Sequence, residues 1–227
     1  SSVTIGNGIT TIPQQCFNGC TSLQSVSIGS GVTTIAPAAF YECGLTSLTI
    51  PDNVVSISAN AAPSFGSFQN CTHLSALTLS SGLTTLGSWA FYGCTALQNV
   101  VIPQSVTNMG EDTFGYSGLQ SVTVNCSNTG QWTFEGCSGL TSYTLNGVTI
   151  IGARAFSDCV ALTNITIPNS VTTIGEDAFA DCRSLTEISI PNSITTIEYG
   201  TFHNCQSLTT ITIPSSVTTI GGQAFYN

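Results

Sequence analysis

The chain has 227 residues, enough for one domain or at most two, and 41% of them are hydrophobic. Only 6% are charged, and 11 acidic against 2 basic side chains give a net charge of −9. This balance excludes nucleic-acid binding and docking on an anionic membrane, because both need clustered Lys and Arg. No stretch approaches the roughly 18 consecutive apolar residues of a membrane-spanning helix, so we expect no membrane insertion.

A sequence repeat runs through the whole chain. Its clearest unit is residues 162–184, LTNITIPNSVTTIGEDAFADCRS, and the next unit begins LTEISIPNSITTIEYGTFHNCQS. The repeat is marked by ten phenylalanines separated by 23, 28, 23, 23, 20, 22, 23, 23 and 23 residues: Phe17, Phe40, Phe68, Phe91, Phe114, Phe134, Phe156, Phe179, Phe202 and Phe225.

Each unit predicts the same short elements in the same order. In residues 162–184 the alternation of Ile165 and Ile167 predicts a strand with one buried face. Pro168 ends this strand, because proline cannot donate to the ladder. A second short extended segment follows, and the spacing of Phe179 and Cys182 predicts a single helical turn after it.

A unit of this kind has no second layer against which to bury its apolar side chains. Only stacking on neighbouring units buries them, which is the principle of a solenoid. We therefore predict that residues 1–227 form a single repeat solenoid, mainly β with short helical or 3-10 turns. About ten coils would lie roughly 4.8 Å apart where their strands pair.

The recurring run IPNSVTTIG-x-x-AF-x-x-C, clearest in residues 162–225, resembles the BspA-like leucine-rich repeat of bacterial and protist surface proteins. The resemblance covers essentially the whole chain, from Val3 to Tyr226. It implies a leucine-rich-repeat solenoid that is extracellular or on the cell surface and is used in attachment. It implies no catalytic residue and no cofactor, and it does not identify a ligand.

The candidate functional sites are the segments in which the sequence departs from the repeat period. An insertion near 58–67 brings Phe65, which either packs beneath the loop, the alternative we favour, or is an exposed apolar contact. Trp89 and Tyr92 then flank Phe91, with Tyr116 one coil later. A shortened, irregular coil near 119–139 lacks the usual proline and second strand and contains Trp132. These aromatic residues are candidate ligand contacts, and sequence drift without a ligand is the alternative.

Two residue types are expected to stack from coil to coil inside the solenoid. Because a small apolar residue once per coil fits a packed turn, we interpret the cysteines as buried free thiols rather than disulfides. Cys16 and Cys126 stand outside this series. The predicted ladders contain Phe40, Phe68, Phe91, Phe156, Phe179 and Phe202, and Cys43, Cys71, Cys94, Cys159, Cys182 and Cys205.

No arrangement of residues predicts catalysis or a resident metal. His73 and His203 are several coils apart, too far for the contact that a nucleophile and its base require. Stacked acidic residues could hold calcium, but acids are also favoured at the start of a helical turn. We predict a surface ion pair between Arg154 and Asp177. Possible glycosylation sites are the sequons that begin at Asn70, Asn125 and Asn164.

Three functions remain open. The first is a non-catalytic extracellular or cell-surface protein that binds a protein or a glycan in adhesion. The second is a filament subunit that stacks on itself head to tail, because no polar capping unit precedes Val3 or follows Phe225. A chain cut from a longer repeat protein explains the same ends. The third is ice binding through exposed threonine rungs such as Thr172 and Thr173.

Overall fold

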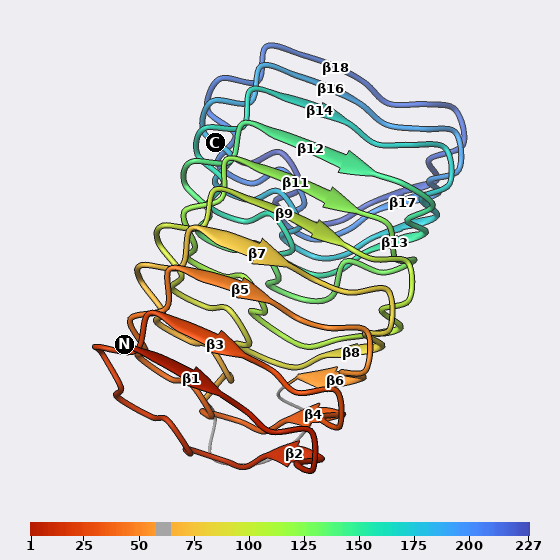
Figure 1. Cartoon of the computed structure of the whole chain (residues 1–227). Coiled ribbons are helices and arrows are strands. Elements are labelled where there is room, and N and C mark those ends of the chain that lie inside the picture. Colours follow the sequence, from red (N-terminus) through yellow and green to blue (C-terminus); the bar gives the residue numbers. More distant parts are fainter. Residues whose placement is uncertain (58–64) are drawn as a thin grey trace.

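The chain coils into an elongated stack of turns. A computed structural model describes residues 1–57 and 65–227. The two termini lie at opposite ends of the stack (Figure 1). The regular coils carry one strand on each of two sides, so the predicted repeat solenoid is confirmed. The insertion expected near 58–67 lies mostly outside the described residues.

The first row of strands runs along one side of the solenoid. Its strands are paired in parallel within four groups, and the groups follow one another along the same side (Figure 1). The row contains β1 (Ser2–Thr4), β3 (Ser25–Ser27), β5 (Ser47–Thr49), β7 (Ala76–Thr78), β9 (Asn99–Ile102), β11 (Ser121–Val124), β12 (Ser142–Leu145), β14 (Asn164–Thr166), β16 (Glu187–Ser189) and β18 (Thr210–Thr212).

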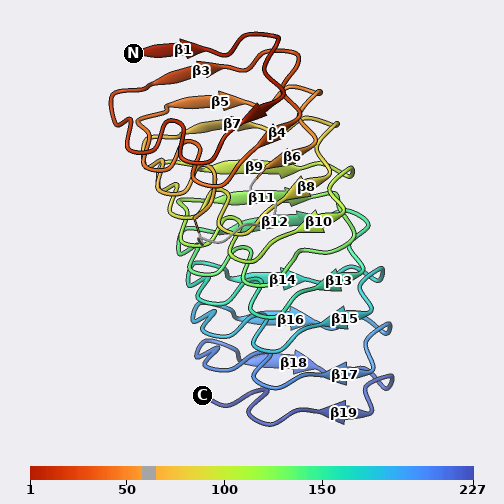
Figure 2. The same ribbon diagram turned by 90° about the horizontal axis from the view of Figure 1, so that it is seen from below.

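The second row of strands is shorter in each coil and is divided into three parallel sheets. Five strands, from β2 to β10, form the first sheet, and the row resumes at β13 with the pairs β13–β15 and β17–β19 (Figure 2). The row contains β2 (Thr11–Ile12), β4 (Thr34–Ile35), β6 (Ser56–Ile57), β8 (Thr85–Leu86), β10 (Asn108–Met109), β13 (Ile150–Ile151), β15 (Thr173–Ile174), β17 (Thr196–Ile197) and β19 (Thr219–Ile220). The shortened coil, residues 119–139, lacks a second strand, as its sequence predicts.

Register in both rows places equivalent residues beside one another. Ile165 of β14 pairs with Ile188 of β16, which pairs with Ile211 of β18. Ile165 and Ile188 are buried while their strand neighbours are exposed. Alternation along each strand therefore becomes an apolar column inside the solenoid and a polar column outside it.

The turn around each phenylalanine is not the helical or 3-10 turn that the spacing predicts. In the described residues this turn has two left-handed residues four positions apart, with φ of 52° at Asp177 and 59° at Asp181. A left-handed residue cannot continue a helix. Instead, the N–H groups of Asp177, Phe179 and Asp181 donate to carbonyls of the next coil at 2.9, 3.0 and 2.8 Å.

Phenylalanine rings stack through the centre of the solenoid. Neighbouring ring centroids are 5.1 to 6.0 Å apart, and the widest interval, between Phe114 and Phe134, spans the shortened coil. The eight rings from Phe40 to Phe202 are at most 1% exposed, and Phe17 and Phe225 are half-buried in the first and last coils. The stack extends the apolar core along the full length of the solenoid.

Candidate ligand-binding surface

One side of the solenoid is formed by the residues that flank each stacked phenylalanine, and we call it the turn face. Tyr92 and Tyr116 meet on this face, with ring centroids 5.5 Å apart and an interplanar angle of 48°. Tyr116 is 48% exposed. The two rings lie over glycines: a Cβ on Gly115 would come within 3.2 Å of the Tyr92 ring, and one on Gly136 within 2.6 Å of the Tyr116 ring. The missing side chains of these glycines let the rings lie along the coils.

The two tryptophans occupy one structural position, two residues before the stacked phenylalanine of their coil. Trp89 has φ of 56° and Trp132 φ of 53°, in the left-handed region where glycine, asparagine and aspartate are usual. Asp112 takes the same position in the coil between them, and the Trp89 indole partly offsets the rise that burial causes in the pKa of its carboxyl. Both indoles are half-buried. Bulky aromatic side chains at a position that disfavours them suggest a role other than packing.

Carboxylates surround this aromatic pair. Desolvation is the main cause that raises the pKa of Asp112, of Glu135 and of Asp158, with smaller contributions from neighbouring acids. Burial first, and then the charges of Asp112 and Glu135, raise the pKa of Tyr92. The charges of these acids therefore act on the hydroxyls of Tyr92 and Tyr116, whose pKa values they raise after burial does. We call Trp89, Tyr92, Asp112, Tyr116, Trp132 and Glu135 the aromatic–acidic patch.

Phe65 does not belong to this patch. Its ring packs edge-on against Tyr41, with centroids 5.1 Å apart and an interplanar angle of 67°, and it remains 41% exposed. It is therefore neither fully packed beneath the insertion nor free of contacts.

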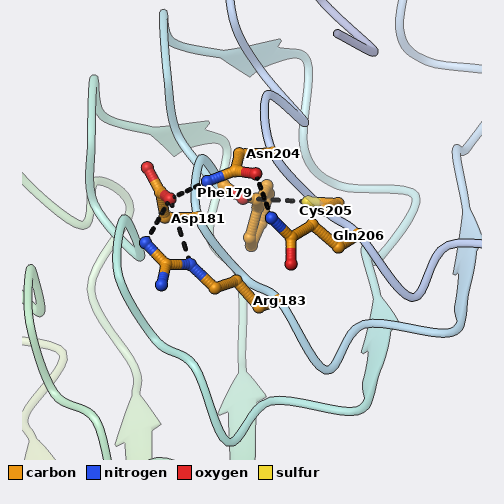
Figure 3. A network of polar contacts seen from close by, with 6 residues as sticks. All are labelled: Phe179, Asp181, Arg183, Asn204, Cys205 and Gln206. Atoms are coloured by element: carbon orange, nitrogen blue, oxygen red, sulfur yellow. Dashed lines mark hydrogen bonds and ion pairs between the residues drawn. The ribbon is translucent and has the colours of Figure 1, made fainter. Parts of the chain in front are cut away.

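The basic side chains of the turn face are both held by aspartates. The predicted pair of Arg154 and Asp177 is present, with Nη2 3.2 Å from Oδ2. Arg183 contacts Asp181 at 2.9 Å, and Asn204 donates to the same carboxylate oxygen (Figure 3). Neither guanidinium forms an ion pair with Asp112 or Glu135 among the described residues, although the charge of Arg154 lowers the pKa of the Glu135 carboxyl. The patch therefore presents carboxylate acceptors beside a guanidinium that Asp177 already holds.

The cysteines have little accessible chemistry. In the described residues all ten are free, and all but Cys16 and Cys20 are buried. The Cys126 thiol donates to the carbonyl of Asn128 at 3.2 Å. No group of three or more His, Cys, Asp or Glu that could hold a metal ion occurs among these residues.

The three sequons lie in different surroundings. The Asn70 amide donates to the Tyr41 hydroxyl at 3.4 Å, and Asn125 accepts from Asn146 at 2.8 Å. Asn164 is exposed on β14. Glycosylation at these sites stays a prediction, and an intact mass of the protein expressed in a secreting eukaryotic host tests it.

The sequence analysis does not predict that Asp112 and Glu135 belong to the patch, nor which aromatic residues they lie near. Trp89, Tyr92, Tyr116 and Trp132 were distinguishable as aromatic residues outside the repeat pattern. In the sequence, Asp112 is one of two acids at its repeat position, the other being Asp177. The signal that could have identified it is its place one coil after Trp89, at the same repeat position.

The sequence matches one family profile over its whole length. Six copies of the BspA type leucine-rich repeat region cover residues 1–64, 64–183 and 128–227. A search of curated proteins finds no match. No helix in residues 1–57 and 65–227 is long and apolar enough to cross a membrane.

Solved structures of bacterial proteins share the fold. A leucine-rich cell surface protein from Faecalibacterium prausnitzii is 26% identical, with a TM-score of 0.55 over 95% of this chain and 61% of its own. A leucine-rich repeat protein from Eubacterium ventriosum is 26% identical, with a TM-score of 0.59 over 99% of this chain and 58% of its own. The pneumococcal vaccine antigen PcpA, 20% identical with a TM-score of 0.53 over 99% of this chain and 75% of its own, shows the fold alone. The chain thus spans about three fifths of the first two proteins.

Proposed function

Because the chain belongs to the BspA type leucine-rich repeat family, we propose that it is a non-catalytic surface protein that binds a ligand in adhesion. The ligand we propose is a neutral glycan, bound at the aromatic–acidic patch. The observation that carries this proposal is the contact between the half-buried ring of Tyr92 and the exposed ring of Tyr116, near Asp112 and Glu135. The surface location is supported by the Faecalibacterium protein, which is described as a cell surface protein.

The chemistry of the patch suits a sugar. Aromatic ring faces carry partial negative charge, so they attract the polarised C–H groups on the flat face of a pyranose. Ionised carboxylates only accept hydrogen bonds, and sugar hydroxyls donate them. An acidic glycan would be repelled by a chain of net charge −9, so a neutral glycan is the better match.

A neutral-glycan array probed with the whole 227-residue chain tests this function. We expect binding that Tyr116→Ala weakens at least about tenfold, because the most exposed ring of the pair is lost. Tyr199→Ala is the matched control, since Tyr199 is 45% exposed and lies on other coils. Equal binding by both variants, or no glycan bound by the unmodified chain, would contradict the proposal.

Self-stacking into a filament remains the alternative. It is supported by the turn geometry, in which a coil donates N–H groups to the next and accepts from the one before. Two solenoids could therefore join end to end with the same bonds. Solution mass by light scattering over a concentration series distinguishes this from glycan binding, because only a filament subunit grows with concentration.

Ice binding is the third candidate, and the second row of strands is where it would reside. The hydroxyls of Thr33, Thr172 and Thr218 each contact the carbonyl of the preceding coil at 3.2 to 3.3 Å. The shortened coil interrupts the rows of threonines. A thermal-hysteresis assay that shows ordinary freezing would remove this candidate.

A further inference from the structure

A hollow lies on the turn face between the aromatic–acidic patch and the C-terminal end of the solenoid. Its volume is about 300 Å³, at the lower end of the roughly 300 to 1,000 Å³ of small-molecule sites. Ser157 and Ala180 line it, each directly after the stacked phenylalanine of its coil, and both are 5% exposed. The same position holds Tyr92 and His203 in other coils. The two small side chains therefore leave a space that larger ones fill elsewhere.

The border of the hollow keeps an excess of negative charge. It contains four carboxylates and one guanidinium: those of Glu135, Asp158, Asp177 and Asp181, and that of Arg154. Asp177 holds Arg154 at 3.2 Å, and Asp181 holds Arg183 at 2.9 Å (Figure 3). Glu135 and Asp158 form no ion pair among the described residues. These two carboxylates are therefore the charged acceptors that the hollow offers to a ligand.

The Ser157 hydroxyl is a buried polar group that lacks a protein partner. The N–H of Ser157 donates to the Arg154 carbonyl at 3.1 Å, and its carbonyl accepts from Gly136 at 2.9 Å. In the described part of the chain, no hydrogen bond involves the hydroxyl itself, although the residue lines the hollow and is only 5% exposed. Because an unpaired buried hydroxyl costs free energy, a polar ligand atom in the hollow would stabilise it.

We propose that the hollow binds a primary ammonium group between the carboxylates of Glu135 and Asp158 and the hydroxyl of Ser157. An ammonium group has three N–H donors and no acceptor, and these side chains supply three acceptors. They come from two neighbouring coils, which the bond from Gly136 to the Ser157 carbonyl joins. The alkyl chain that carries the ammonium group then lies over the small side chain of Ala180. This site goes beyond the proposed glycan binding, with which it shares only Glu135.

The electrostatic environment of the hollow favours a cation. Burial first, and the charge of Asp181 next, raise the pKa of Asp158, although the nearby guanidinium groups oppose the rise. Burial and then the charge of Asp112 raise the pKa of Glu135. A bound cation would offset the repulsion between these acids. A metal ion is a poorer match, since no group of three or more His, Cys, Asp or Glu that could hold one occurs in the part of the chain that the structure describes.

Two sources present this chemistry: a lysine side chain of a partner protein and a free polyamine. Separate titrations of the isotopically labelled whole chain with Nα-acetyl-lysine methylamide and with spermidine, followed by NMR, test the proposal. We expect saturable shifts of the Ser157 and Ala180 amide signals with at least one of them. Nα-acetyl-norleucine methylamide has the same carbon chain without the ammonium group and should cause none. Tighter binding of the lysine derivative identifies a protein partner, and tighter binding of spermidine identifies a free polyamine.

Ser157→Ala distinguishes a built site from general attraction to an acidic protein, because it changes no charge. We expect it to weaken amine binding at least about fivefold, since the ammonium group loses one acceptor. Ser142→Ala, at an exposed serine of β12, is its matched control and should have no effect.

Asp158→Asn tests the charged part of the site. We expect it to weaken binding at least about tenfold, and asparagine tolerates the left-handed backbone of this position, where φ is 57°. Glu187→Gln, at an exposed residue of β16, removes the same charge elsewhere and should leave binding unchanged. No shift with either amine, equal shifts with the norleucine derivative, or equal affinities of the Ser157→Ala and Ser142→Ala chains would overturn the proposal.

Discussion

The thiol of Cys205 lies 3.3 Å from the carbonyl oxygen of Phe179 in the preceding coil (Figure 3). The same contact joins Cys182 to Phe156 at 3.3 Å and Cys94 to Phe68 at 3.3 Å. The cysteine ladder therefore does more than fill space: each thiol donates to a carbonyl that the turn leaves with only one backbone donor. The thiol joins two coils at the level of the phenylalanine stack.

Replacement of Cys205 separates this hydrogen bond from simple packing. We expect Cys205→Ala to lower the free energy of unfolding by about 1–3 kcal/mol, because it removes a buried donor and leaves a small cavity. Cys205→Ser keeps a donor and should cost less, as Ser117 occupies a ladder position and contacts Cys137 at 3.4 Å. Urea titration measures both. Equal losses would show that the thiol only fills space.

Truncation of one ring tests the phenylalanine stack. Phe179 is fully buried between Phe156 and Phe202, with centroids 5.4 and 5.8 Å away. We expect Phe179→Ala to cost about 3–5 kcal/mol through the cavity it leaves. Phe65→Ala is the control, because Phe65 is 41% exposed and outside the stack. A loss below about 1 kcal/mol at Phe179, measured by denaturant titration, would contradict the stacking account.

The repeat was predictable from the sequence because identical residues at fixed spacing can only be buried by stacking. The strand at Ile165 and the phenylalanine and cysteine positions follow directly from that spacing. The turn was not predictable in the same way. A spacing of three residues between Phe179 and Cys182 fits a helical turn and also fits the observed turn with its left-handed residues. The hydrogen bonds to the next coil select the second conformation, and the spacing does not reveal them.

The same distinction holds for the candidate sites: a departure from the repeat is visible in the sequence, whereas the contacts around it are not. The aromatic residues Tyr92 and Tyr116 are visible as departures from the repeat pattern, but their contact depends on the glycines beneath them. The shortened coil near 119–139 predicts a missing strand, but it does not predict the side-chain hydrogen bonds found there: the Asn128 amide oxygen accepts from the N–H of Gly130, and the Thr129 hydroxyl accepts from the N–H of Gly152.

Alkaline pH should destabilise the protein through the buried thiols. Burial raises the pKa of Cys71 and Cys205 to about 12 and that of Cys43 and Cys137 to about 11. A thiol in the unfolded chain titrates near 8.5. Above that pH the unfolded chain gives up protons that the folded chain keeps, so stability is full below about pH 8.5 and falls as the pH rises toward 11 to 12.

The decline is measurable as the urea midpoint at several pH values between 7 and 11. The double variant Cys71→Ser, Cys137→Ser should show a shallower decline, because serine does not titrate in this range. A midpoint that declines equally in both chains would show that groups other than these thiols are responsible.

Mild acid should stabilise the protein through Glu135 of the aromatic–acidic patch and through the nearby Asp158. Desolvation first, and neighbouring acids second, raise the pKa of Glu135 and Asp158 above their ordinary values. The folded chain then binds protons at a higher pH than the unfolded chain does. Its stability consequently rises as the pH falls from 7 through these raised pKa values.

Thermal midpoints between pH 7 and pH 4 measure this effect, and Glu135→Gln should flatten the rise because the amide carries no charge. Glu187→Gln is the control, since Glu187 is exposed on β16, away from the patch. Binding should respond in the opposite sense, because a protonated Glu135 accepts hydrogen bonds less well than the carboxylate. A glycan affinity that weakens over the same pH range in which stability rises would tie both effects to this carboxyl group. A thermal midpoint that falls from pH 7 downward in the unmodified chain would contradict the prediction.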